Sequence, residues 1–437
     1  MKDSGIEWIG EIPEEWELKR LKWILVERKE KNDPQKTDFI LSLGAAYGVI
    51  PYSEKEGGGN KAKDNLTDYR LAYPDDIVMN SMNIISGSVG ISKFFGCVSP
   101  VYYILYPHNS DSCSEYFCYL FQTTPFQRSL LGFGNGILMK ESSTGNFNTV
   151  RMRIPMDKLG VQILPFPSYS EQRIIVTYLD AQCAKIDAIL EQTRQSIEEY
   201  KKLKQAVITR AVTKGIRPGR KMKDSGVEWI GEIPVEWTIC KLKHIGSTQN
   251  GISKGGDFFG QGYPFVSYGD VYRNYSLPYD VQGLIESTRE EQVLYSVKRG
   301  DVFFTRTSET IEEVGFSSVC ERTIPNATFA GFLIRLRPFD DTLNVNYAKY
   351  YFRSNHHRFY LVKQMNLVTR ASLGQSLLKG MHVLVPSKEE QVEIANYLYS
   401  KSFEIDSVIE KKQLFLTELD SYKKSLIYEC VTGKREV

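Results

Sequence analysis

Apolar and neutral residues recur in steps of three and four along two long segments of the chain. Such steps follow one stripe of an α-helix. The pattern predicts one helix over 171–213 and a second one after Glu390. The first would be roughly 60 Å long at about 1.5 Å per residue. The stripes are Ile186, Leu190, Thr193, Ile197, Tyr200, Leu203, Val207 and Ala211 in the first segment, and Ile405, Ile409, Leu416, Leu419, Tyr422, Leu426 and Cys430 in the second.

The residues that flank both stripes fit helix ends. Ser170 and Glu171, after Pro167, favour a helix start. Gly215 and Gly433 follow the last stripe residues, and glycine favours a helix stop because it leaves the helix without strain.

A narrow stripe on so long a helix is typical of a coiled coil, and the other helix is the natural partner. Similar domains joined to equivalent helices favour an antiparallel pair with a pseudo-twofold axis. The alternative is two separate helices, each lying on its own domain. The expected interface consists of Ile186, Leu190, Ile197, Tyr200, Val207, Ile405, Ile409, Leu416, Leu419 and Leu426.

The chain also repeats itself in sequence. MKDSGIEWIGEIP begins at Met1, and MKDSGVEWIGEIP begins at Met222. The SYSEQ segment at Ser168 and the SKEEQ segment at Ser387 match across the same interval. Nearly equal shifts indicate two similar halves. The ends of each half are alike and the middles differ, which favours one shared task for the ends and separate tasks for the middles. Drift after an old duplication is the alternative.

The repeat predicts an α/β (α+β) fold with two similar globular domains joined by the two long helices. A chain of 437 residues is long enough for such a division. Residues 1–16 are expected to pack near the end of the second helix, around Val431. The remaining segments are a first variable domain at 17–166, the central helix at 167–215, a linker with the repeated opening at 216–237, a second variable domain at 238–386 and the C-terminal helix at 387–437.

Short patterns inside the variable domains predict individual elements. GDVFFTRT and FLIRLRPF read as strands, the second with Phe332, Ile334 and Leu336 alternating against two arginines. The segments 114–122 and 347–362 read as short helices.

Composition narrows the class of protein. Hydrophobic residues make up 42% and charged residues 25%, as in ordinary globular proteins. No apolar run is long enough for a membrane span, and the start lacks the apolar core of a signal peptide. Seven scattered cysteines without a CxxC pair favour a reducing cytoplasm over a disulfide framework or a zinc site. The net charge of +2 requires any basic face for nucleic acid to be local.

Catalytic signatures are missing from the sequence. There is no GxxxxGK[ST] loop, no HExxH motif and no Asn/Asp-Pro-Pro-aromatic motif of an amino-methyltransferase. Pro74-Asp75 resembles the start of a nuclease motif, but the matching position in the second half is Arg299-Gly300-Asp301. His356–His357 is interpreted as a solvated helix pair and not as a metal site. The sequence therefore predicts a chain with no catalytic and no metal residues.

Loops that are rich in polar hydrogen-bond donors are the remaining candidates for a functional site. Arg, Asn, Gln and Ser side chains can read base edges in a DNA major groove, although they are also common in loops without a function. A basic run over 201–223 could hold phosphates or could be a solvated helix end. The candidate DNA-binding residues are Asn80, Ser81, Asn83, Lys140, Ser143, Asn146 and Asn148 in the first half, and Arg306, Thr307, Ser308, Arg370, Ser372 and Gln375 in the second.

The repeated DSGxEWxGxIPxxW opening and the twofold EQ-x(5)-YL-x(6)-ID helix start resemble the specificity subunit of type I restriction–modification systems. The resemblance covers essentially the whole chain. It implies a non-catalytic, cytoplasmic DNA-binding subunit with two target recognition domains, each reading one half of a bipartite double-stranded DNA site. It implies an antiparallel coiled coil that sets the spacing between the halves.

The same resemblance implies partner proteins. Two modification (methyltransferase) subunits would dock on this chain, and restriction (translocase-nuclease) subunits would join them. S-adenosylmethionine, ATP and Mg²⁺ would be bound by those partners, and no cofactor by this chain. The divergent middles predict an asymmetric target. Two rival functions are a coiled-coil scaffold without DNA sequence preference and a stand-alone DNA methyltransferase or nuclease.

Overall fold

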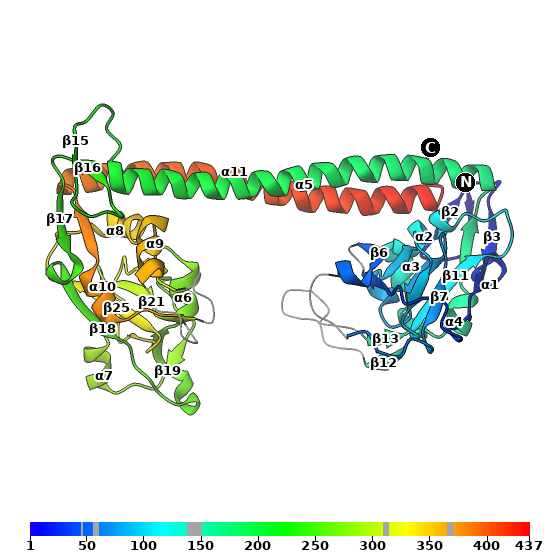
Figure 1. Cartoon of the computed structure of the whole chain (residues 1–437), viewed down its shortest axis with the longest axis horizontal. Helices are drawn as coiled ribbons and strands as arrows, with labels where there is room; N and C mark the ends of the chain where they lie inside the picture. The colour runs from blue at the N-terminus through cyan, green and yellow to red at the C-terminus, as the bar shows by residue number, and fades with distance from the viewer. Residues whose placement is uncertain (45–46, 56–60, 138–150, 309–313, 365–370) are drawn as a thin grey trace. The chain divides into compact units, whose positions relative to one another are not determined.

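The computed structural model describes residues 1–44, 47–55, 61–137, 151–308, 314–364 and 371–437. The chain forms two compact units. Unit 1 comprises Met1–Thr193 and Leu414–Val437, and unit 2 comprises Arg194–Gln413. Each unit holds one globular domain and a portion of both long helices, α5 (Tyr169–Lys214) and α11 (Lys388–Val431), which are the two long ribbons in Figure 1. The two predicted long helices are confirmed.

The domain of unit 1 is built from short strands and helices. They are β1 (Lys2–Asp3), β2 (Glu11–Ile12), β3 (Glu17–Arg20), α1 (Leu21–Ile24), β4 (Leu25–Glu27), β5 (Leu41–Gly44), β6 (Gly48–Pro51), β7 (Arg70–Ala72), β8 (Ile77–Asn80), β9 (Val89–Ile91), β10 (Gly96–Val98), β11 (Tyr102–Pro107), α2 (Ser114–Gln122), α3 (Thr124–Ser129), β12 (Asn135–Ile137), β13 (Arg151–Arg153), α4 (Met156–Gly160) and β14 (Ile163–Phe166), with the 3₁₀ turns η1 (Tyr52–Glu54), η2 (Ile84–Ser86) and η3 (Leu131–Phe133).

The domain of unit 2 follows the same plan. Its elements are β15 (Met222–Asp224), β16 (Glu232–Pro234), β17 (Thr238–Lys241), η4 (Leu242–His244), β18 (Gly246–Asn250), η5 (Gly256–Phe258), β19 (Phe259–Val266), α6 (Tyr268–Arg273), β20 (Leu284–Ile285), α7 (Arg289–Leu294), β21 (Val302–Thr305), β22 (Thr307–Ser308), β23 (Ser317–Val319), β24 (Thr328–Phe329), β25 (Leu333–Pro338), α8 (Val345–Tyr351), α9 (Asn355–Gln364), β26 (Ala371–Ser372), α10 (Gln375–Gly380) and β27 (His382–Val385).

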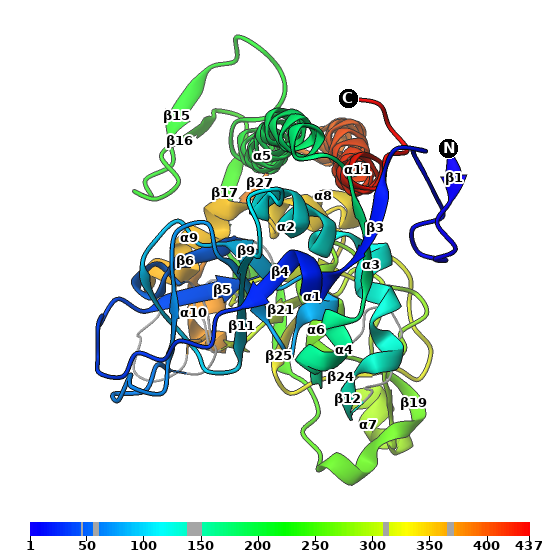
Figure 2. The same cartoon turned by 90° about the vertical axis from the view of Figure 1, so that its right-hand side faces the viewer.

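The central sheets of the two units have the same strand order. Unit 1 has β4-β11-β8-β9 and unit 2 has β18-β25-β21-β23, and every neighbouring pair is antiparallel. The predicted strands GDVFFTRT and FLIRLRPF are β21 and β25. In unit 1, α2 lies between the sheet and the ends of α5 and α11 (Figure 2). The duplication detected in the sequence is therefore a duplication of fold.

An aspartate occupies the same turn in both sheets. Asp76 precedes β8, is buried and forms a bidentate ion pair with Arg28. Asp301 precedes β21, is buried and forms a bidentate ion pair with Arg337. Each carboxylate also accepts a bond from the backbone amide three residues earlier. The hydrogen bond to Asp76 raises the pKa of Arg28. Asp76 and Asp301 are thus held in equivalent ion pairs inside the two units.

The two long helices run antiparallel in each unit. In unit 1, Tyr178 bonds to Arg435, and Asp187 pairs with Lys423 at 2.6 Å. In unit 2, Lys204 pairs with Asp406 at 2.6 Å, and Arg217, just after α5, pairs with Glu393 at 2.9 Å. In both units, the residue numbers of the partners fall as the residue numbers along α5 rise, as expected for antiparallel helices.

Most residues of the expected helix interface are covered. Six of them are at most 9% exposed, namely Ile186, Leu190, Ile197, Ile405, Ile409 and Leu426, whereas Tyr200, Val207, Leu416 and Leu419 are half-buried. The prediction is wrong for two residues of the stripes, because Leu203 is 48% and Tyr422 is 49% exposed. A straight helix drifts relative to a 3.5-residue repeat. In unit 2 the buried position next to Val207 is therefore Ile208.

The repeated opening forms a hairpin at the end of a long helix in each unit. In unit 1, the Tyr428 hydroxyl of α11 donates to the Trp8 carbonyl at 2.9 Å, and Ile9 and Ile12 share a core with Val431. In unit 2, Ile230 and Ile233 share a core with Val212 of α5. Each helix ends in a left-handed glycine, Gly215 or Gly433. A Cβ on Gly433 would lie 2.3 Å from Pro13, so the close approach requires glycine.

The glutamine of the repeated EQ pair holds each domain against its long helix. Gln391 is fully buried, accepts from the Asn344 amide at 2.7 Å, and donates to the carbonyls of Thr342 and Pro386. Gln172 is equally buried and bonds in the same way to the Cys113 amide and to the carbonyls of Asp111 and Pro167. One side chain thus fixes the start of α8 or of α2 on the start of the long helix.

Replacing either glutamine by methionine should destabilise its own unit by at least about 3 kcal/mol. Methionine has a similar shape, but three backbone partners, which lie partly or fully out of water, would each lose a hydrogen bond at about 1–3 kcal/mol. Denaturant unfolding of Gln172→Met and Gln391→Met measures the loss. Val392→Met, at the exposed neighbouring position, is the control. Stability losses no larger than that of the control would contradict the assigned role.

The predicted helix 347–362 is two helices, α8 and α9, because the chain turns at 352–354. The interpretation of His356–His357 as a solvated pair is also wrong. His357 is 1% exposed, its Nδ1 lies 2.8 Å from the Ser354 hydroxyl, and its ring is 4.1 Å from that of Tyr351. Trp229 of the repeated opening packs on the His356 ring at 4.8 Å. Burial lowers the pKa of His356 to about 4 and the pKa of His357 well below 6.5.

Unit 2 should lose stability as the pH falls from 7 to 5. Both folded-state pKa values lie below the ordinary value of 6.5, so the unfolded chain binds more protons in this window. Protons therefore favour unfolding below about pH 6.5. Urea unfolding at several pH values should show a shallower decline for the double variant H356Q/H357Q than for the parent chain. Parallel declines would show that these histidines are not buried in their neutral form.

Candidate nucleic-acid interface

The candidate residues of unit 2 gather at one edge of the central sheet. Strand β21 ends at Thr305, and the Arg306 amide donates to the Phe332 carbonyl at 3.0 Å. The Arg306 carbonyl in turn accepts from the Leu373 amide at 2.7 Å. Thr307 and Ser308 form β22, which pairs with Ala371 and Ser372 of β26. The structure therefore brings together two candidate groups that lie more than 60 positions apart in the sequence.

Gln375 lies beside this ribbon, in the first turn of α10. Its side chain accepts from the Thr248 hydroxyl at 2.8 Å and donates to the Asn250 amide oxygen at 3.0 Å. Both partners lie on β18, the neighbouring end of the sheet. Sequence reasoning missed Thr248 and Asn250. The polar end of an otherwise apolar sheet, SerThrGlnAsn at 247–250, was the signal that could have found them.

Unit 1 has a similar edge with different side chains. Asn80 ends β8, and its side-chain oxygen accepts from the Met82 amide at 3.1 Å. The Ser81 carbonyl accepts from the Ile154 amide at 3.1 Å, as the Arg306 carbonyl does from Leu373. Asn83 is half-buried and directly precedes the 3₁₀ turn η2. The hairpin strands β12 and β13 lie next to this turn. The same position in two folds thus carries two different sets of polar groups.

The prediction that Ser81 contacts DNA is wrong. It is fully buried, and its hydroxyl donates to the Val101 carbonyl at 2.6 Å, so it holds the turn that presents Asn80 and Asn83. Several other candidates lie outside the described residues: Lys140, Ser143, Asn146, Asn148 and Arg370.

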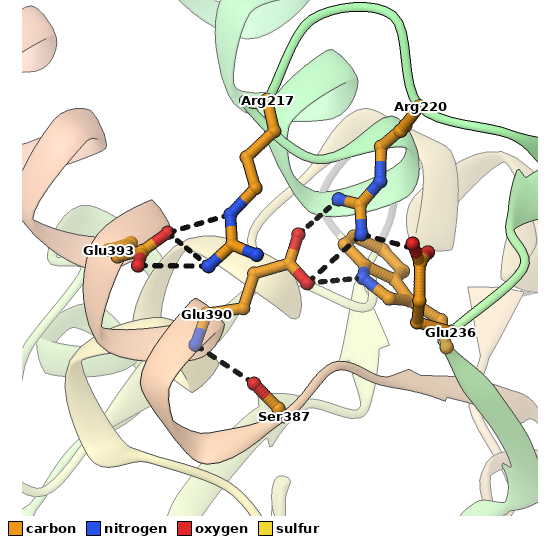
Figure 3. A network of polar contacts seen from close by, with 7 residues as sticks. Arg217, Arg220, Glu236, Ser387, Glu390 and Glu393 are labelled. Atoms are coloured by element: carbon orange, nitrogen blue, oxygen red, sulfur yellow. Dashed lines mark hydrogen bonds and ion pairs between the residues drawn. The ribbon is translucent and has the colours of Figure 1, made fainter.

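Much of the basic run over 201–223 is occupied within unit 2. Lys204 pairs with Asp406. Arg217 and Arg220 bind Glu393 and Glu390, and Arg220 also contacts Glu236 at 3.1 Å (Figure 3). These ion pairs raise the pKa values of both arginines. These three residues of the run therefore join α5 and the segment after it to α11.

Figure 3 also shows how the domain of unit 2 is attached to the start of α11. Glu390 is buried, accepts from the Trp237 indole at 2.9 Å and pairs with Arg220, while its own amide donates to Ser387 at 3.2 Å. Unit 1 repeats the central contact, because the Trp16 indole donates to Glu171 at 3.1 Å. The repeated opening and the repeated EQ pair thus meet in space in each unit.

The described residues contain no cluster of three or more His, Cys, Asp and Glu side chains suited to a metal ion. None of the helices that they form combines the length and the apolarity needed to cross a membrane.

Comparison with known proteins gives a consistent class. Residues 234–413 match the family described as the type I restriction modification DNA specificity domain. The EcoKI specificity subunit of Escherichia coli K12 is 23% identical, with 97% of this chain and 90% of that protein covered. The StySPI specificity subunit of Salmonella potsdam is 22% identical over 62% of this chain, and the chain spans 57% of the length of that relative.

Solved structures show the same fold. A chain from a type I restriction–modification system has a TM-score of 0.72 at 14% identity, with 97% of this chain and 100% of that chain covered. The HsdS subunit of Thermoanaerobacter tengcongensis has a TM-score of 0.53 at 13% identity, with 97% and 98% covered. The chain thus shares its fold with these two solved chains. Residues 234–413 therefore match a DNA-specificity-domain family, and the chain as a whole is similar to specificity subunits of type I restriction enzymes.

Proposed function

We propose that this chain is the DNA sequence-specificity subunit of a type I restriction–modification complex and is itself non-catalytic. Each central sheet would present its polar edge to one half of an asymmetric, bipartite double-stranded DNA site. The observation that carries the proposal is the pair of equivalent edges. The contacts that the repeated Trp, Glu and Gln side chains make at the start of each long helix are the same in both units. The polar residues at the edges of the two central sheets differ. Two domains that are held in the same way but present different polar side chains are suited to recognising two different DNA sequences.

Contacts at the two edges would have distinct tasks. Arginine and asparagine side chains, such as Arg306 and Asn80, would donate to base edges, at about 1–3 kcal/mol for a good bidentate pair. Phosphate contacts would add affinity that weakens with salt and carries no sequence information. With a net charge of +2, the chain would rely on partners for much of that affinity.

The partners would be two modification subunits docked on the helix pair, with restriction subunits joining them in the cytoplasm. The modification and restriction subunits would bind S-adenosylmethionine, ATP and Mg²⁺. Two cheap observations separate this proposal from its rivals. S-adenosylmethionine binding by the isolated chain would favour a methyltransferase in its own right. Failure of the assembled complex to enrich any sequence from a pool of random duplexes would favour a scaffold.

The helix pair would set the distance between the half-sites. Adding one heptad to both α5 and α11, at the junctions 193/194 and 413/414 between the units, lengthens each helix by about 10 Å. We expect the unspecified gap in the target to grow by about three base pairs at 3.4 Å each, while both half-sites stay the same. Methylation mapping measures the gap, and an unchanged gap would refute the spacing role.

A further inference from the structure

Phe332 is a largely exposed aromatic residue at the edge of the central sheet of unit 2. It immediately precedes β25, and its side chain is 64% exposed. The next two residues, Leu333 and Ile334, are fully buried in the sheet. The ring therefore projects from the point where the strand enters the core.

The backbone around Phe332 is fixed on several sides. The Phe332 carbonyl accepts from the Arg306 amide at 3.0 Å, and the Gly331 amide donates to the Ile252 carbonyl at 2.8 Å. The Leu333 amide donates to Ala330 at 3.0 Å. An ordered turn thus holds the exposed ring, so little conformational entropy of the backbone is lost when the ring binds a partner.

The surroundings of the ring point to DNA as that partner. Arg306 lies beside it, directly after β21, and the β22–β26 ribbon continues from Arg306. Asn250 ends the other neighbouring strand, β18, where it bonds to Gln375. An apolar ring thus stands at the same sheet edge as hydrogen-bonding side chains suited to base edges.

Unit 1 has an exposed apolar residue at the equivalent position. Tyr102 pairs with Asn80 as Leu333 pairs with Thr305, so Val101 corresponds to Phe332. Val101 is 45% exposed, and its carbonyl accepts from the Ser81 hydroxyl, whereas the Phe332 carbonyl accepts from the Arg306 backbone amide. Both edges therefore present an apolar group at this point, and the groups differ in size.

We propose that Phe332 is a specificity-determining residue that packs its ring on an apolar part of a base in the half-site read by unit 2. The inference rests on the proposed function. Aromatic side chains can cover the C5-methyl group of thymine in the major groove or lie against a partly unstacked base. Both modes bury the ring against DNA and remove exposed apolar surface from water.

The test uses the specificity chain assembled with its modification subunits and a duplex that carries the motif which the complex methylates. Phe332→Ala should weaken specific binding about tenfold or more, with little change in binding to a non-specific duplex. Phe339→Ala is the matched control, because Phe339 lies at the other end of β25 and is 66% exposed. It should bind like the parent complex.

Replacing single thymines of the second half-site by deoxyuridine separates the two modes. If a thymine methyl is the partner, one such replacement weakens the parent complex and has no effect on Phe332→Ala. If the ring lies against an unstacked base, Phe332→Ala still loses affinity, but the replacements act equally on both proteins. Unchanged specific binding by Phe332→Ala, while the parent complex prefers its motif, overturns the inference alone. No sequence preference by the parent complex overturns the proposed function.

Discussion

Replacing Glu390 by alanine should cost unit 2 about 3–5 kcal/mol of folding free energy. The variant leaves the Arg220 guanidinium, whose side chain is 9% exposed, without its main counter-charge. It also leaves the Trp237 indole N–H, in a fully buried side chain, without the carboxylate that accepts its hydrogen bond. Denaturant unfolding measures the loss, and hydrogen exchange of the amides at the start of α11 locates it.

The neighbouring ion pair offers a matched control. Arg217 and Glu393 also bond in a bidentate manner, but both side chains are about half exposed. Water replaces such a bond readily, so Glu393→Ala should change stability little. Glu171→Ala in unit 1 should be intermediate, since it frees the Trp16 indole but no arginine. Equal losses for Glu390→Ala and Glu393→Ala would show that the buried network is not the attachment of the domain.

Exchanging residues 17–166 for the matching segment of a related specificity subunit should change one half of the DNA target only. Recognition of the original first half-site should fall about 10³-fold or more, towards non-specific binding. The structure favours these boundaries because β3 and β14 pair with each other, with Glu17 opposite Phe166. Both ends of the exchanged segment therefore enter and leave at one place. Methylation mapping of the assembled hybrid complex reads both half-sites at once.

The second half-site is the internal control of this exchange, because 238–386 is untouched. Strands β17 and β27 close that segment in the same way, with Thr238 opposite Val385. The reciprocal exchange at 238–386 should alter the other half-site. A change of both half-sites by either exchange would contradict two independent readers.

Much of the architecture could be predicted because it depends on periodicity and repetition. A stripe of apolar residues in steps of three and four is typical of a long helix and fits few other structures. The recurrence of Trp16 as Trp237 and of Gln172 as Gln391 corresponds to contacts that are made once in each unit. The errors lie where side chains meet partners from distant segments. His357 is buried because Tyr351 and Trp229 cover it, and no local pattern reports that.

The candidate DNA edge was harder to predict for a related reason. Polar residues in a loop look alike whether they point outward or hold a turn, as Ser81 does through the Val101 carbonyl. The pairing of Thr307 with Ser372 joins segments whose sequences carry no mutual signal. Phe332 was interpreted as one residue of an alternating strand, and only the register places it outside the strand with its ring exposed.

The most direct test of the central claim is a methylome. The chain would be expressed with and without its modification subunit in a host that lacks DNA methylation, and modified bases would be read by long-read sequencing. We predict one split motif, with two different short halves around a fixed unspecified gap, only when both proteins are present. A soluble complex that leaves no motif, or a motif formed without this chain, would contradict a DNA-reading specificity subunit.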